Sequence, residues 1–192
     1  MNQKIGLFFG SFNPVHNGHL MLANYIVEYT DLDSIWFVVS PQNPFKEENS
    51  LLQDFHRRDM LKMAVGNDSR FEVCDIEFNM PKPSYTIDTL TRLTELYPNV
   101  DFYLICGMDN LVSFDKWKDY QCILDNYNII VYPRNNYDGG EFVNHKSVRV
   151  IDAPEIEISS TFIRNAVAEN KDVRYFMPEK SYKYMIDMNF YK

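Results

Sequence analysis

Residues 5–20, with the sequence IGLFFGSFNPVHNGHL, decide the fold. Residues 5–9 are apolar and predict a buried strand. Gly10 then starts a glycine turn, and a polar loop leads to His16 and His19, where we expect a helix to begin. A strand that delivers a glycine turn to a helix N-terminus predicts a phosphate site, because the first amides of a helix are unpaired and face the ligand.

The two histidines are three residues apart, so they share one face if the helix has started. Two imidazoles beside anion-attracting amides favour charge stabilisation on a nucleotide triphosphate. Gly18 leaves a side-chain gap between them through which a base or a phosphate can approach. The alternative is a strand, a turn and a helix with two solvated histidines, and a short motif alone does not decide between the two.

Composition and charge bound the class of protein. With 192 residues, 45% of them hydrophobic, the chain can bury a full core, and we expect one domain, 1–192, with a C-terminal helical part from about residue 155. A net charge of −8 argues against a nucleic-acid binder, which needs a broad basic surface. The sequence has neither a signal-peptide pattern nor an apolar run of membrane-spanning length. We therefore predict a cytoplasmic protein that binds neither nucleic acid nor membrane.

The three cysteines are widely spaced, and none belongs to a CxxC pair: Cys74, Cys106 and Cys122. This pattern is typical of reduced thiols, and we expect them to be mostly buried rather than to hold a metal. No metal-binding set of side chains is predicted.

Apolar runs without alternation are typical of strands covered on both faces, which occur in parallel sheets. The expected strands are 5–9, 35–39, 71–74, 101–106, 127–132 and 147–151. The expected helices are about 18–29, 53–65, 84–97, one or two within 110–124, 159–169 and about 182–190, and we expect loops at 40–49, 77–83 and 135–146. This alternation predicts an α/β fold, a Rossmann-like doubly wound parallel sheet with helices on both faces.

Ligands of such sheets bind outside the carboxyl ends of the strands, near the switch in strand order. The polar, glycine-rich or cationic stretches of the chain all follow predicted strands: 10–19, 40–46, 107–109, Arg134 and 159–164. The site is therefore expected at this edge of the sheet.

A second motif lies at residues 158–164, ISSTFIR. The hydroxyls of Ser159 and Ser160 and the amides of a helix start can hold an anion, and Arg164 lies one turn further in. Alone, this stretch is more often a capped helix with a surface arginine. Two helix N-termini with cations at one edge of a sheet favour a polyphosphate held between them.

Three further positions have an ordinary structural reading as well as a functional one. Lys46 alone is more often a solvated lysine, and Asp109 could accept from ribose hydroxyls or cap a helix. Trp117, beside Lys118, could be a platform for a planar ring, although a core residue is the more frequent case.

Residues 10–19 and 158–164 together resemble the nucleotidyltransferase superfamily with HxGH and ISSTxxR motifs. Residues 84–90, SYTIDTL, the turn at 107–109 and the pair 117–118 narrow the resemblance to the bacterial nicotinate-nucleotide adenylyltransferases. The similarity covers nearly the whole chain in the expected order.

The resemblance implies a reaction of NAD biosynthesis: ATP and nicotinate mononucleotide give deamido-NAD and pyrophosphate, with Mg²⁺ as cofactor. The catalytic residues that it implies are His16, His19, Lys46 and Arg164. The implied ATP site consists of Gly10, Ser11, Phe12, His16, Gly18, His19, Ser159, Ser160 and Arg164. The implied nicotinate mononucleotide site consists of Lys46, Thr86, Gly107, Asp109, Trp117, Lys118 and Arg134.

Within that site, Thr86 matches the position that recognises the nicotinate carboxylate, largely through backbone amides, and Trp117 matches the one that stacks on the ring. Two positions depart from the family pattern. Asn13 replaces the usual aspartate, which loses a charge but keeps an acceptor, and Phe45 stands where a histidine often precedes the lysine.

The chain offers no obvious Ser–His–Asp or Cys–His set, which suits an acceptor whose phosphate is already a nucleophile. The alternatives are a related enzyme with a phosphopantetheine or nicotinamide mononucleotide acceptor, a cytidylyltransferase, a non-catalytic ATP-binding sensor and, weakest, a structural His₂ metal protein. Size and acidity exclude a class I aminoacyl-tRNA synthetase. The sequence leaves open whether copies of the chain form a homo-oligomer.

Overall fold

The computed structural model describes residues 2–41 and 51–192. Within these residues, six strands form one parallel sheet in the order β3-β2-β1-β4-β5-β6. The strands are β1 (Gln3–Gly10), β2 (Ser34–Val39), β3 (Phe71–Cys74), β4 (Val100–Gly107), β5 (Asn128–Tyr132) and β6 (Val148–Val150). The predicted doubly wound parallel sheet is confirmed.

The four inner strands, β2, β1, β4 and β5, form where the apolar runs predicted them, because most of their side chains are buried on both faces of the sheet, whereas the edge strands β3 and β6 are more exposed. Leu7 of β1 is in register with Trp36 of β2 and with Leu104 of β4, and both leucines are fully buried. Successive residues of a strand face opposite sides, and the core accordingly divides in two, with Leu7 in one cluster and Phe8 in the other.

Helices cover both clusters. The cluster that contains Phe8 includes buried residues of α1 (Asn17–Tyr29), α2 (Asp54–Val65), α6 (Ser160–Ala168) and α7 (Glu179–Asp187). The cluster that contains Leu7 includes residues of α3 (Thr86–Leu96), α4 (Met108–Val112) and α5 (Tyr120–Asn126). Four short 3₁₀ helices in the described chain complete the connections: η2 (Ile76–Asn79), η3 (Phe114–Lys116), η4 (Gly140–Phe142) and η5 (Arg174–Phe176).

The order of the sheet switches direction between β1 and β4, and both strands end in glycine at this point. A Cβ on Gly107 would lie 2.3 Å from the Oδ1 atom of Asp109, and one on Gly10 would lie 2.8 Å from the ring of Phe12. Both glycines are therefore needed for close approach of the following loop to the sheet.

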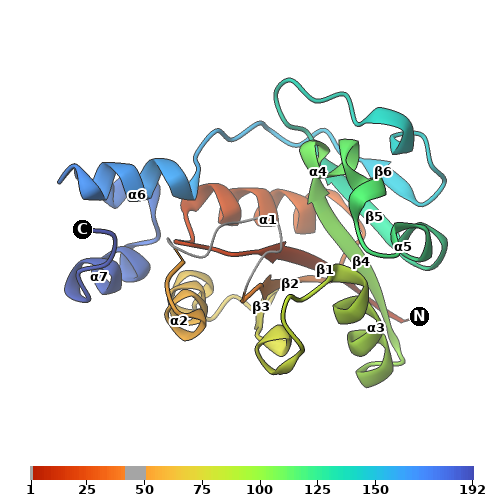
Figure 1. Cartoon of the computed structure of the whole chain (residues 1–192), viewed down its shortest axis with the longest axis horizontal. Helices are drawn as coiled ribbons and strands as arrows, with labels where there is room; N and C mark the ends of the chain where they lie inside the picture. The colour runs from red at the N-terminus through yellow and green to blue at the C-terminus, as the bar shows by residue number, and fades with distance from the viewer. Residues whose placement is uncertain (1, 42–50) are drawn as a thin grey trace.

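The chain returns across the molecule after β6. In Figure 1 the light blue connection passes over α1 and reaches α6 and α7 at the end of the molecule opposite β6. The hydroxyl of Tyr25 on α1 donates to the carbonyl of Asp152 in this connection across 2.7 Å. This path brings the start of α6 to the loop after β1.

The structure corrects three details of the prediction. Residues 77–83 were expected to form a loop, but η2 begins this stretch, because Glu77 is buried and anchored by side-chain hydrogen bonds. The loop at 135–146 likewise contains η4. Cys122 is exposed rather than buried, because it lies on the outer side of α5, where Ile123 and Leu124 turn inward.

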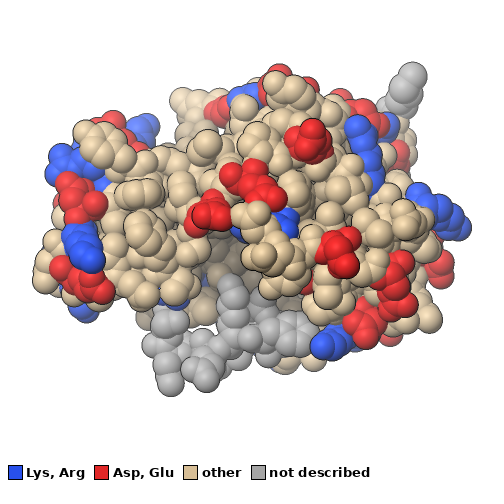
Figure 2. All heavy atoms as spheres, turned by 90° about the horizontal axis from the view of Figure 1, so that it is seen from above, with Lys and Arg blue, Asp and Glu red and all other residues tan. Residues whose placement is uncertain are grey.

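Acidic side chains are scattered over the face of the molecule in Figure 2, and basic side chains lie mostly toward its ends. In the part of the chain that the structure describes, each helix is too short or too polar to cross a bilayer.

Candidate active site

Two cavities adjoin at the carboxyl edge of the sheet, where the switch in strand order predicts a ligand. They measure about 540 and 610 Å³, and both are lined by Phe8, Phe9, Gly10 and Tyr132. We call the larger one the histidine cavity, because His16, His19, Ser159 and Arg164 line it, and the other the tryptophan cavity, because Thr86, Asp109 and Trp117 line it.

The two histidines lie together at the start of α1. Their rings stack, with centroids 3.6 Å apart, and the backbone N–H of His16 donates to Nδ1 of His19 across 3.2 Å. A ring nitrogen that accepts a hydrogen bond carries no proton, so the neutral His19 ring has its proton on Nε2. The fold therefore fixes the tautomer of His19 that can donate through Nε2.

His16 is the more buried of the pair, with 5% of its surface exposed. Burial, and secondarily the positive charge of Arg134, lower the pKa of His16 to about 4. Its Nδ1 atom has no hydrogen-bond partner among the described residues. Burial and the charge of Arg134 keep His16 neutral near pH 7.

The second motif docks directly on the first loop. Ser159 caps α6 by accepting from the N–H of Phe162 across 3.1 Å. The hydroxyl of Ser160 donates to the carbonyl of Pro14, 146 residues away in the chain, across 2.8 Å. The structure thus brings the N-termini of α1 and α6 to one cavity, as the sequence predicted.

Arg164, one turn into α6, is fixed by two hydrogen bonds. Its Nη1 donates to the carbonyl of Asn13 across 2.8 Å, and its Nη2 donates to the hydroxyl of Thr161 across 3.3 Å. The guanidinium is therefore held against the wall of the histidine cavity rather than in bulk solvent.

The tryptophan cavity lies at the start of α3. The helix begins at Thr86, so the N–H groups of Thr86 and Ile87 have no partner within the helix, whereas the N–H of Asp88 donates to the carbonyl of Tyr85 across 3.0 Å. Trp117 is half-buried and packs on Phe114 with ring centroids 5.0 Å apart, so it lines the cavity as well as the core. Lys118 bonds both carboxylate oxygens of Asp88 at 2.9 Å and lies 4.9 Å above the ring of Tyr85.

Arg134 and Asp109 lie where the two cavities meet. The Nε of Arg134 is 4.0 Å from Oδ1 of Asp109, and its guanidinium lies 5.2 Å from the ring of Tyr132, which lines both cavities. The residues predicted to bind the mononucleotide therefore line two different cavities. Arg134 lines the histidine cavity, whereas Thr86, Asp109, Trp117 and Lys118 line the tryptophan cavity.

Some predicted site residues do not line either cavity. Gly107 and Gly18 are buried and act through close packing; a Cβ on Gly18 would come within 3.0 Å of the His16 ring. Lys46 and Phe45 lie outside the described residues.

The chain is similar to known proteins over nearly its whole length. Residues 7–166 match the Cytidylyltransferase-like family. A probable nicotinate-nucleotide adenylyltransferase of Cytophaga hutchinsonii is 49% identical over 188 residues, which cover 98% of each chain. A protein of the same name from Christiangramia forsetii is 47% identical over 194 residues, which cover the whole of both.

The chain belongs to the nicotinate-nucleotide adenylyltransferase family. The structure of Plasmodium falciparum nicotinic acid mononucleotide adenylyltransferase complexed with NaAD has the same fold, with a TM-score of 0.84 over 98% of this chain and 97% of that one, at 23% identity.

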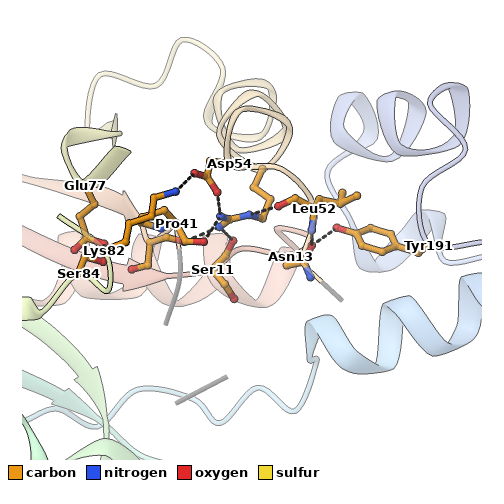
Figure 3. Close-up of polar contacts among 11 residues, drawn as sticks. Ser11, Asn13, Pro41, Leu52, Asp54, Glu77, Lys82, Ser84 and Tyr191 are labelled. Carbon is orange, nitrogen blue, oxygen red and sulfur yellow. Dashed lines mark hydrogen bonds and ion pairs between the residues drawn. The ribbon is translucent and has the colours of Figure 1, made fainter. Parts of the chain in front are cut away.

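Arg57 is an important residue of this adenylyltransferase that sequence reasoning missed. Its side chain is fully buried and donates to the carbonyls of Ser11 (2.6 Å), Ser40 (2.8 Å), Pro41 (3.1 Å) and Leu52 (2.9 Å) and to the carboxylate of Asp54 (2.8 Å; Figure 3). It ties the loop after β1 to the loop after β2. In the sequence, the burial of Arg57 is indicated locally only by Asp54, which lies three residues earlier on the same helix face and can form an ion pair with it.

Glu77 is a second buried ionisable residue of the site that the sequence did not reveal. It lines the tryptophan cavity and accepts from the hydroxyls of Ser84 and Thr89, both at 2.7 Å. Burial raises the pKa of its carboxyl. These bonds fix the segment that enters α3.

Proposed function

We propose that the two cavities hold the two substrates of the reaction that names the family, with ATP in the histidine cavity and nicotinate mononucleotide in the tryptophan cavity. In this reaction the 5′-phosphate of the mononucleotide forms a bond to the α-phosphorus of ATP. The bond to the bridging oxygen breaks, and its electron pair leaves with pyrophosphate. The observation that supports the assignment most strongly is the docking of α6 on the loop before α1, which directs two helix N-termini at one cavity.

On this proposal, the triphosphate lies between α1 and α6. The first amides of both helices, the hydroxyl of Ser159 and the guanidinium of Arg164 bind its oxygens. Gly10, Ser11 and Phe12 form the turn beneath it, and Ser160 holds the turn in place through Pro14.

The nucleophile is an anion, so the reaction needs no general base, and the work is to align two anions and neutralise charge. His19, through its Nε2–H, stabilises the charge that develops on the α-phosphoryl group. His16, which stacks on the ring of His19, contacts the same phosphates. Lys46 is assigned a part in this neutralisation by the family resemblance alone.

Transfer from a nucleoside triphosphate requires a divalent cation, and we propose Mg²⁺. Among residues 2–41 and 51–192, no cluster of three His, Cys, Asp or Glu side chains could hold a metal ion. The donor atoms that remain are the oxygens of the triphosphate, so the ion is expected to enter with ATP. It would then offset phosphate charge beside Arg164.

The acceptor is proposed to lie with its ring against Trp117 and its carboxylate at the amides of the first turn of α3, near Thr86. Its phosphate then points toward the junction of the cavities, where Arg134 lies. Asp109 at the same junction is placed to accept from ribose hydroxyls. Gly107 gives Asp109 the room it needs, and Lys118 holds the start of α3 through Asp88.

The decisive experiment measures pyrophosphate release from ATP and Mg²⁺ with each of three acceptors: nicotinate mononucleotide, nicotinamide mononucleotide and phosphopantetheine. We expect clear preference for the first. Preference for another acceptor would contradict the assignment of the tryptophan cavity, and ATP binding without release would indicate a sensor. The His19→Ala protein, prepared in parallel, controls for contaminating activity.

A further inference from the structure

The C-terminal segment of the chain reaches the loop before α1. The hydroxyl of Tyr191 donates to Oδ1 of Asn13 across 2.7 Å, although 178 residues separate them. Figure 3 shows the two side chains pointing toward each other, with Tyr191 coming from the turn after α7 and Asn13 from the loop after β1.

Tyr191 is held in a defined place. After α7 the chain reverses, with the N–H of Phe190 donating to the carbonyl of Met185 across 3.1 Å. Asn189 and Tyr191 adopt φ angles of 57° and 63°, a left-handed conformation that is costly for a tyrosine. Burial raises the pKa of the Tyr191 hydroxyl, so it stays protonated and donates.

Asn13 receives this bond at a central position of the site. The same Oδ1 atom accepts from the N–H of Leu52 across 3.2 Å, and the carbonyl of Asn13 accepts from Arg164 across 2.8 Å. The carbonyl of Leu52 in turn accepts from Arg57. One residue therefore joins the C-terminal segment, the loop after β1 and the arginine of the histidine cavity.

We propose that Tyr191 is a positioning residue for ATP, acting through Asn13 on Arg164; the inference rests on the proposed function, which places ATP in the histidine cavity. Without the phenol hydroxyl, Oδ1 of Asn13 loses one of the two donors that the described residues supply, and the carbonyl that orients Arg164 is less firmly held. A guanidinium displaced by a fraction of an ångström binds phosphate less well.

The inference also accounts for the asparagine at position 13. Among residues 2–41 and 51–192, the donors to Oδ1 of Asn13 are a phenol hydroxyl and a backbone N–H, and both need an acceptor oxygen. An amide supplies that oxygen without adding charge to the site.

The test is Tyr191→Phe, which removes one oxygen atom and keeps the ring. The matched control is Tyr182→Phe on α7, whose hydroxyl bonds Asp172 at 3.2 Å, away from both cavities. We expect the Kd for Mg-ATP, measured by calorimetry without acceptor, and the KM for ATP to rise about three- to tenfold, the equivalent of one hydrogen bond. The KM for the mononucleotide should match that of the control. Unchanged ATP binding, or equal increases for both substrates, would overturn the proposal.

A double-mutant cycle tests the route through Asn13. If Tyr191 acts through this residue, Tyr191→Phe weakens ATP binding far less in an Asn13→Ala background than in the wild-type protein. Full additivity would overturn it. Calorimetry keeps this test separate from the proposed function: a wild-type protein that binds ATP without releasing pyrophosphate fails the function, whereas the effect of Tyr191 on ATP binding is still measured.

Discussion

The guanidinium of Arg164 donates to the carbonyl of Asn13 across 2.8 Å, although the two residues are 151 positions apart in the chain. This bond lies between the two motifs that the sequence analysis treated as halves of one site. The hydroxyl of Ser160 makes a parallel bond to Pro14. The relative position of the two helix N-termini is thus set by side chains of one motif and carbonyls of the other.

Replacement of Arg164 by lysine tests whether ATP binding depends on the planar hydrogen bonds of the guanidinium as well as on its positive charge. Lys keeps the positive charge but cannot bond Asn13 and a phosphate oxygen in the same plane. We expect Arg164→Lys to raise the KM for ATP about tenfold or more, while the KM for the mononucleotide changes little. Steady-state kinetics with each substrate varied in turn provides the measurement. Arg174→Lys, at an exposed ion pair with Asp172, is the control, and equal effects of the two would contradict the prediction.

His19→Ala should lower kcat by about two to three orders of magnitude, the usual effect of losing a donor to a developing negative charge. His19→Gln should recover part of this loss, because its amide nitrogen can approach the position of Nε2. Both proteins should keep the fold, as judged by circular dichroism. The control is His145→Ala, before β6, where the ring bonds Ser147; turnover near the wild-type value in His19→Ala would refute the role.

The lowered pKa of the buried His16 implies that the free energy of unfolding depends on pH. Its pKa is about 4 in the folded protein and 6.5 when solvated, so between these values the unfolded chain binds more protons. The free energy of unfolding therefore falls as the pH falls from about 6.5 to about 4, and a difference of about 2.5 units amounts to about 3 kcal/mol. Urea denaturation between pH 7.5 and pH 4 measures this loss.

His16→Asn is the comparison for that prediction, because it removes the titrating ring and leaves Arg134 and the other ionisable groups in place. The difference in unfolding free energy between the two proteins should change with pH in favour of the variant on acidification. A difference that stays constant from pH 7.5 to pH 4 would show that His16 does not titrate as its burial implies.

The sheet and the location of the site were predictable because their signals are local. Apolar runs such as residues 35–39 specify buried strands, and Gly10 and Gly107 mark the strand ends at which the chain must turn tightly. The switch in strand order then places the site at this edge, so His16 and Ser159 could be assigned to one cavity before their contacts were known.

The supports of the site were not predictable, because they depend on which distant segments meet. Arg57 lies on an amphipathic helix where an arginine is normally solvated, and the carbonyls that make its burial favourable come from the loops after β1 and β2. Glu77 was assigned to a loop, and Tyr191 lies just beyond the predicted C-terminal helix of about 182–190. The partner atoms are mainly backbone carbonyls for Arg57, hydroxyls for Glu77 and an amide oxygen for Tyr191, and such contacts leave no pattern in the sequence.

Trp117 should affect the acceptor and not ATP. Trp117→Ala removes the aromatic wall of the tryptophan cavity, and we expect the KM for nicotinate mononucleotide to rise about tenfold, with the KM for ATP within about twofold of the wild-type value. Trp117→Phe keeps a ring over Phe114 and should lie between the two. An increase confined to ATP would place the substrates the other way round.

Arg57 should contribute to the stability of the site far more than its neighbour does. Arg57→Met removes five hydrogen bonds and leaves four buried or half-buried carbonyls without this donor, while Asp54 keeps Lys82 at 3.2 Å. We expect the free energy of unfolding to fall by about 3–5 kcal/mol. Arg58→Met is the matched control on the next position of α2; its ion pairs with Asp59 and Asp75 are solvated, so its loss should cost less than about 1 kcal/mol. Equal destabilisation by the two variants, measured by urea unfolding at pH 7.5, would show that Arg57 is not the tie between the loops after β1 and β2.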